Sequence, residues 1–169
     1  TAPTASDTTA LVIPFAGFTG NITIVNDIAD PFILNSLTVT TTTRNVTLNG
    51  GALSFQGTDP TLAVNPPATC LSRANSDVYF NDGLTLMATG ATGAQLHVQG
   101  AISSSSTGPT TLTLRGSSVN ALNRVGGLIS NGASSALSVF KTDAGQWSLT
   151  NAGNSFTGGL TIEQGILRY

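Results

Sequence analysis

Short segments in which apolar residues alternate with small polar residues recur along the whole chain. Each segment has two apolar side chains two positions apart, with Thr, Ser or another small or polar residue between them. This period of two is typical of a β-strand with one buried face. The segments are Asn21–Val25, Ser36–Thr40, Asn45–Leu48, Ala52–Phe55, Gly83–Met87, Ala94–Val98, Thr110–Leu114, Ala136–Phe140, Gln146–Leu149, Gly159–Ile162 and Gly165–Leu167. The pattern therefore predicts an all-β protein.

Turn sequences separate these segments at several points. Asn49-Gly50-Gly51, Asp82-Gly83, Asn131-Gly132 and Gly158-Gly159 supply residues that adopt positive φ at little steric cost. No stretch shows helical periodicity. Many short strands with such turns are compatible with a sandwich, a barrel or a solenoid.

Two features favour a parallel β-solenoid, with a β-sandwich as the alternative. The segments resemble copies of one unit, Leu followed by Thr or Ser and another apolar residue, which is typical of repeat architectures. Charged residues make up only 8% of the chain. Stacked turns would place like charges in rows, whereas Thr, Ser and Asn form hydrogen-bonding ladders. We predict an extended segment at 1–18 and one solenoid domain at 19–169, with a Pro-containing loop inserted at about 56–77.

Composition and charge exclude several classes of protein. With 40% apolar residues and a net charge of −2, the chain does not have the composition of a disordered segment. Its six basic residues are scattered in the sequence, so we predict no nucleic-acid partner. The apolar stretch 10–18 is too short to span a bilayer and contains Pro14, so we predict no membrane span. The single cysteine, Cys70, is expected to be a buried thiol.

Residues that could carry catalysis or bind metal are few. His97 is the single histidine, and the alternation around it places it on the polar face of its strand. Asp27, Asp30, Asp77 and Asp82 flank turns, where carboxylates bond to nearby backbone. One Cys and one His do not make a zinc site. We predict no catalytic residue, no metal site and no cofactor, and hence no enzyme.

The C-terminal stretch Lys141–Tyr169 carries a longer pattern, which reads KTDAGQWSLTNAGNSFTGGLTIEQGILRY. It resembles the autotransporter-associated β-strand repeat, and Asp143 stands where that repeat usually has its first Gly. The resemblance implies a right-handed parallel β-helix, secreted by bacteria and displayed on or released from the cell surface, without catalytic residues of its own. It places Trp147, Leu149, Phe156, Ile162 and Leu167 in the core of the repeat. It places Gly158, Gly159 and Gly165 in the turns. The other matching residues are Lys141, Gly145, Asn154 and Thr161.

The two ends of the predicted solenoid expose strand edges. The chain runs in strand pattern to Tyr169, and its N-terminal segment is apolar and extended. We expect this segment to add a strand to the next subunit, through Leu11, Val12, Ile13, Phe15 and Phe18. The sequence thus predicts a non-enzymatic extracellular structural protein that assembles head-to-tail into a surface fibre or filament. An adhesin or carbohydrate-binding passenger fragment, with surface glycans as partners, is the alternative.

Overall fold

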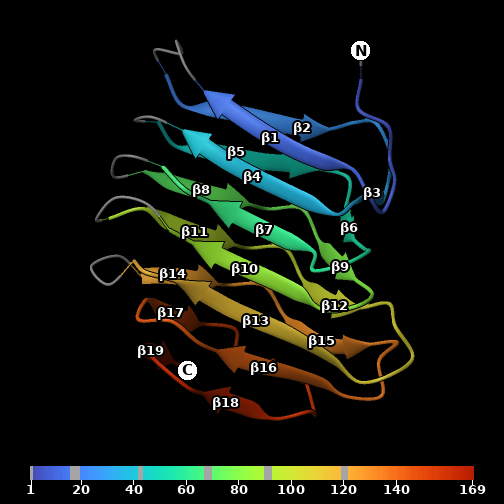
Figure 1. Cartoon of the computed structure of the whole chain (residues 1–169), viewed down its shortest axis with the longest axis vertical. Helices are drawn as coiled ribbons and strands as arrows, with labels where there is room; N and C mark the ends of the chain where they lie inside the picture. The colour runs from blue at the N-terminus through green and yellow to red at the C-terminus, as the bar shows by residue number, and fades with distance from the viewer. Residues whose placement is uncertain (1, 16–19, 42–43, 67–69, 90–92, 119–121) are drawn as a thin grey trace.

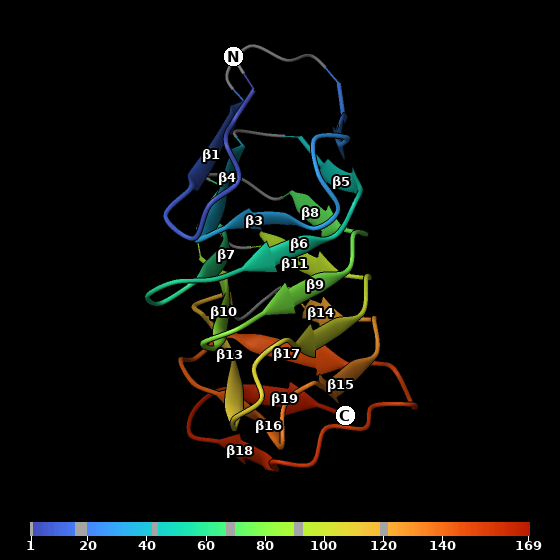
Figure 2. The ribbon, with the colours of Figure 1, turned by 90° about the vertical axis from the view of Figure 1, so that its right-hand side faces the viewer.

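The computed structural model describes residues 2–15, 20–41, 44–66, 70–89, 93–118 and 122–169. In these residues the chain winds through three sheets in turn, and it pairs each strand in parallel with strands of the turns before and after it (Figures 1 and 2). All recorded strand pairings are parallel. The prediction of an all-β parallel solenoid is confirmed, with about five complete turns.

Each sheet runs the length of the solenoid. Sheet A contains β1 (Ala10–Phe15), β4 (Ser36–Thr41), β7 (Thr61–Val64), β10 (Leu84–Ala88), β13 (Thr110–Gly116), β16 (Leu137–Lys141) and β18 (Leu160–Ile162). Sheet B contains β2 (Ile22–Asn26), β5 (Val46–Gly50), β8 (Leu71–Ala74), β11 (Gln95–Val98), β14 (Leu122–Val125), β17 (Gln146–Leu149) and β19 (Ile166–Arg168). Sheet C contains β3 (Phe32–Leu34), β6 (Leu53–Phe55), β9 (Val78–Phe80), β12 (Ile102–Ser104) and β15 (Ile129–Gly132).

The length of one turn can be followed along a row of paired residues on sheet A. The row is Ala10, Ser36, Thr61, Thr85, Thr113, Phe140 and Thr161, with successive separations of 26, 25, 24, 28, 27 and 21 residues. Hydroxyl-bearing residues fill most of it. Loops of different length between the strands absorb the unequal separations, so the strands remain in register although the repeat is irregular in sequence.

The core lies between the three sheets and is built from columns of stacked side chains. One column of sheet A contains Leu37, Leu62, Leu86 and Leu114, all fully or almost fully buried. On sheet C, Phe55 stacks on Phe80. Burying a leucine contributes about 1.5–3 kcal/mol relative to leaving it exposed. Burial of the apolar residues of the alternating pattern is therefore the main source of stability for each turn.

The predicted loop insertion at about 56–77 is wrong, because β7 and β8 lie within it. Proline does not interrupt a ladder when it stands outside the strand or at its start. Pro60 is buried immediately before β7, and Pro66 follows the strand. Cys70, just before β8, is buried as expected. Among the described residues, no helix is long and apolar enough to cross a membrane.

Candidate functional site: the two ends of the solenoid

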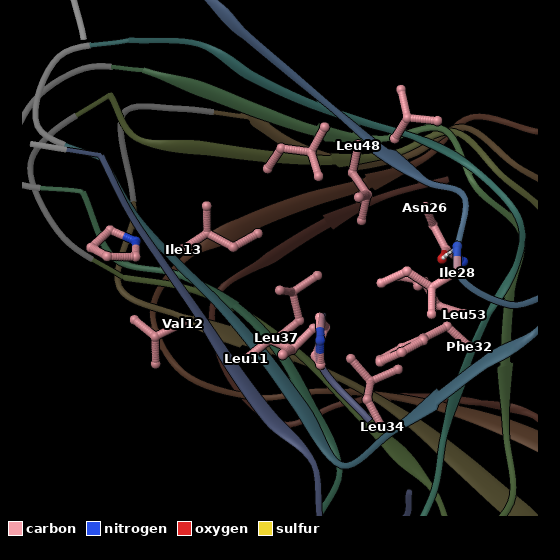
Figure 3. Close-up of a pocket in the computed structure, with 14 residues that line it drawn as sticks. Leu11, Val12, Ile13, Asn26, Ile28, Phe32, Leu34, Leu37, Leu48 and Leu53 are labelled. Atoms are coloured by element: carbon pink, nitrogen blue, oxygen red, sulfur yellow. Dashed lines mark hydrogen bonds between the residues drawn. The ribbon is translucent and has the colours of Figure 1, made fainter. Parts of the chain in front are cut away.

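The N-terminal end of the solenoid opens into an apolar cavity of about 420 Å³. Side chains of the first two turns point into it from all three sheets (Figure 3). Its lining is almost wholly apolar: Pro3, Leu11, Val12, Ile13, Pro14, Ile24, Val25, Asn26, Ile28, Phe32, Leu34, Leu37, Leu48 and Leu53. Leu11, Val12 and Ile13, which we predicted to form a strand with the next subunit, are part of this lining.

The cavity is open because no strand of the described chain covers the first turn. β1 and β2 are the outermost strands of sheets A and B. Their inward-facing residues are only half-buried, whereas the same columns are fully buried deeper in the solenoid. At the rim, Val12 is 61% exposed, Val25 56% and Ile28 49%. An edge strand with exposed apolar side chains is a template for pairing with another strand.

The predicted N-terminal segment contacts its own solenoid. Ser6 N donates to Ile33 O at 3.0 Å, and Thr9 O accepts from Asn35 N at 2.8 Å. β1 then pairs with β4 along its whole length. One edge of β1 is thus used within the chain, and pairing of its other edge with a second subunit stays a prediction. The side chain of Phe15 and the whole of Phe18, which the same prediction names, lie outside the described residues.

The C-terminal end is built around Trp147, which is fully buried. Its ring lies in the inward column of sheet B between Asn123 and Leu167. The indole Nε1 donates to the carbonyl oxygen of Arg115 at 3.1 Å, so the polar atom of the ring is satisfied. Asn123 is also buried and satisfied: its Oδ1 accepts from Leu96 N, and its Nδ2 donates to Gln146 O, both at 3.0 Å.

Lys141 occupies the inward column that leucines fill in the preceding turns. It pairs with Leu114 on one side and Ile162 on the other and is fully buried. Its ammonium donates to the carbonyl oxygens of Thr142 at 2.5 Å, Asp143 at 2.6 Å and Gln164 at 3.0 Å. Burial lowers the pKa of Lys141, and the carboxylate of Asp143 opposes that shift. The three carbonyls belong to the loops that follow β16 and β18, so the ammonium joins two successive turns.

The backbone at Asp143 has a conformation that favours glycine, which accounts for the glycine that the repeat usually has at this position. Its φ is +61°, in the left-handed region that glycine favours and that aspartate tolerates better than most residues. Its Oδ2 accepts from Gly116 N at 3.1 Å and from Arg115 Nε at 3.2 Å. Burial raises the pKa of Asp143, but the bond from Gly116 and the Arg115 guanidinium outweigh this effect and lower it.

The turn glycines of the repeat differ in what constrains them. Gly159 has φ +94° with open space around it, whereas Gly158 lies against Leu137 and Ser138 at ordinary φ. Gly165 combines both constraints: its φ is +80°, and a Cβ there would come within 3.0 Å of Lys141 Nζ and of the Asp143 and Gly145 carbonyl oxygens.

The remaining core residues of the repeat are buried to different degrees. Leu149 is buried, and Phe156 and Leu167 are partly buried against the core. Ile162 stands in the inward column beside Lys141 but is 51% exposed, because β18 is the outermost strand of sheet A. Among the described residues, then, Ile162 does not have the burial expected of a core residue.

Polar side chains join the repeat to the turn before it, a role that the sequence pattern alone does not predict. Asn154 Oδ1 accepts from Ile129 N at 2.9 Å, while Ser155 N donates to Ile129 O at 2.9 Å. Asn131 Oδ1 accepts from Thr157 N at 3.0 Å. These bonds take the place of a further strand of sheet C. The position of Asn154 in the repeat pattern was the one sequence signal available.

Asp30 and Asp77 bond to backbone, but to that of the next solenoid turn and not to the nearby backbone that we predicted. Asp30 Oδ1 accepts from Ala52 N, and Asp77 Oδ1 from Ala101 N, both at 2.8 Å. Each bond joins one turn of the solenoid to the next. In the part of the chain that the structure describes, no three His, Cys, Asp or Glu side chains come together as metal ligands would.

Comparison with known proteins agrees with this picture of the C-terminal end. No curated protein and no solved structure matches the chain. Residues 139–168 match the model of the family described as Passenger-associated-transport-repeat. The match covers the resemblance predicted at Lys141–Tyr169 except for Tyr169, and it includes β17 and β19 around Trp147. The chain therefore carries a passenger-associated repeat on a β-solenoid, a combination that fits an autotransporter passenger-type protein.

Proposed function

We propose that the chain is a non-enzymatic, extracellular passenger-type solenoid whose copies stack head-to-tail into a surface fibre. The observation that carries the proposal is the apolar open end at β1 and β2, with its cavity of about 420 Å³. A stacked strand would satisfy the edges and cover the exposed apolar side chains. The passenger-associated repeat supports a location outside the cell.

A second copy is the occupant that suits the open end, because the columns of the two ends are complementary. The column that starts at Leu11 on β1 ends at Ile162 on β18. The column that starts at Ile22 on β2 ends at Leu167 on β19. Stacking β18 and β19 of one copy on β1 and β2 of the next would place apolar residues on apolar residues. The contact is heterologous and does not close, so it gives a filament.

Charges at the rim provide the test. Val25→Lys with Ile28→Lys places two cations beside the cavity at exposed positions, where folding tolerates them. The control is Leu128→Lys, because Leu128 is also exposed but lies between β14 and β15, far along the solenoid from the N-terminal rim. In sedimentation velocity, the unchanged chain and the control should form large assemblies, and the rim variant should sediment as a 17.1 kDa monomer. A monomeric unchanged chain, or equal assembly by all three proteins, would overturn the proposal.

A further inference from the structure

The fold gathers basic side chains that are scattered in the sequence into one row on the outer face of sheet B. Arg73 on β8 pairs with His97 on β11, and His97 pairs with Arg124 on β14. The same row continues through Ser148 on β17 to Arg168 on β19. Four of the seven Lys, Arg and His side chains of the chain therefore stand in one line. With about 4.8 Å between neighbouring strands, the row spans about 19 Å.

No carboxylate on the same strands neutralises this row. The eight acidic residues lie in the N-terminal segment and in loops, none of them on a strand of sheet B. Three basic residues stand outside the row: Lys141 is buried in the core, Arg115 on sheet A pairs with Asp143, and Arg44 precedes β5. Although the chain as a whole has a net charge of −2, this face carries a positive field.

The side chains of the row are available to a ligand. Arg73 and Arg168 are exposed, and His97 and Arg124 are half-buried. Arg124 is oriented by a bond from its Nε to Thr150 Oγ1 at 2.9 Å. His97 faces a cation from the strand on each side, and its Nε2 lies 3.3 Å from the Leu122 carbonyl oxygen. Burial lowers the pKa of His97, the Leu122 carbonyl opposes this, and Arg124 and Arg73 lower it further.

Like charges in adjacent strands destabilise a sheet, and an anionic ligand would remove that repulsion. We propose that the outer face of sheet B binds a linear anionic polysaccharide, with Arg73, His97, Arg124 and Arg168 facing its carboxylate or sulfate groups. A straight row of cations, interrupted once at Ser148, suits a linear polymer that carries charges along its length. Guanidinium groups bind such oxyanions through two parallel N–H donors.

The neighbouring row favours a sugar polymer over a nucleic acid. Beside the cations run Asn49, Asn75 and Gln99, whose amides suit hydroxyl groups, and Asn75 Nδ2 already donates to Asn49 Oδ1 at 2.8 Å. Proteins that bind single-stranded nucleic acids stack bases on exposed aromatic rings. Apart from the imidazole of His97, the single aromatic ring on the strands of sheet B is that of Trp147, which is fully buried and points inward.

The test measures binding of the whole chain to immobilised heparin, polygalacturonate, neutral dextran and double-stranded DNA at about 0.15 M salt. We expect binding to one or both anionic polysaccharides and none to dextran. The heparin and polygalacturonate arms distinguish sulfate from carboxylate recognition. Arg73→Gln with Arg124→Gln should weaken binding about 100-fold, about tenfold for each charge-assisted contact. Arg73→Gln with Arg168→Gln changes two exposed residues and gives the same readout with little risk to folding.

The matched control is Arg115→Gln, which removes one positive charge on sheet A and should leave the affinity within about twofold. Binding should strengthen as the pH falls through the titration of His97, and His97→Gln should abolish that dependence. Binding to neither heparin nor polygalacturonate would overturn the proposal. So would an Arg115→Gln loss as large as that of an Arg73 or Arg124 single variant, or tighter binding to DNA. The Val25→Lys, Ile28→Lys variant should still bind, because it removes none of the four basic side chains of the row.

Discussion

Alanine substitutions at three glycines of the passenger-associated repeat distinguish the stability cost of backbone conformation from the stability cost of packing. Gly159 has positive φ and open space, Gly158 has close neighbours and ordinary φ, and Gly165 has both constraints. Replacing each with alanine therefore tests the two causes one at a time and then together.

The magnitudes follow from the geometry. Gly159→Ala places a Cβ in the left-handed region, which costs about 1–2 kcal/mol, reduced by about 0.4–1 kcal/mol because alanine restricts the unfolded chain. Gly165→Ala carries the same conformational cost. Its Cβ would also press on two carbonyl oxygens and the Lys141 ammonium, and overpacking of this kind costs about 1–3 kcal/mol. We expect losses of about 1 kcal/mol for Gly159→Ala and about 2–4 kcal/mol for Gly165→Ala, with Gly158→Ala between them.

The assay uses the single tryptophan as a local reporter. Trp147 is fully buried and lies under Leu167 of β19, so release of the last turn exposes its ring. Urea titrations followed by tryptophan emission report that release, and circular dichroism reports the rest of the solenoid. Solenoids lose stability locally at their ends, so the emission midpoint should shift more than the circular dichroism midpoint. Equal losses at Gly159 and Gly165, or no loss at Gly165, would refute the reasoning.

Three further predictions concern the core, the repeat and the titration of His97. Leu86→Ala should cost about 3–5 kcal/mol in global unfolding, because it opens a cavity in a fully buried column; Leu128→Ala, at an exposed position, should cost less than about 0.5 kcal/mol. Asp143→Ala should lower the free energy of unfolding by about 2–3 kcal/mol, because it loses the bonds to Gly116 and Arg115 and keeps an unfavourable φ. Asp143→Gly should lower it by about 1 kcal/mol less, because glycine tolerates that φ. Equal losses for the two variants in chemical unfolding would contradict this prediction. The pKa of His97 is lower in the folded chain than in the unfolded chain, so the unfolded state binds the proton more readily. The melting temperature without ligand should therefore fall as the pH drops from about 6.5 through the folded pKa. His97→Gln should flatten that part of the pH profile.

The sequence was sufficient for the solenoid, because the alternation of Leu, Val and Ile with Thr and Ser recurs in most turns. It did not reveal most of sheet C. Strands such as β3, β9 and β12 have three residues each, too short for a period of two to stand out from the loops around them. β7 and β8 were missed because nearby prolines suggested a loop, although Pro60 and Pro66 lie outside the strands.

The candidate sites were predictable to different degrees. The repeat pattern identified Trp147 and the turn glycines, because each is required by local geometry. The inward position of Lys141 could not be read from the sequence, since its three carbonyl partners come from two successive turns. The basic row is likewise invisible in the sequence. Arg73, His97 and Arg124 are separated by 24 and 27 residues and meet because each turn returns the chain to the same face.

The axial repeat of the fibre tests the proposed head-to-tail stacking most directly. Sheets A and B each have seven strands. If each copy continues the ladder of the previous one, the subunit repeat along the axis is seven strand spacings of about 4.8 Å, or about 34 Å. Electron microscopy with fibre diffraction should therefore show filaments with an axial spacing of about 4.8 Å and a subunit repeat of about 34 Å. Monomers alone, or filaments whose 4.8 Å spacing runs across the axis, would contradict the proposed stacking.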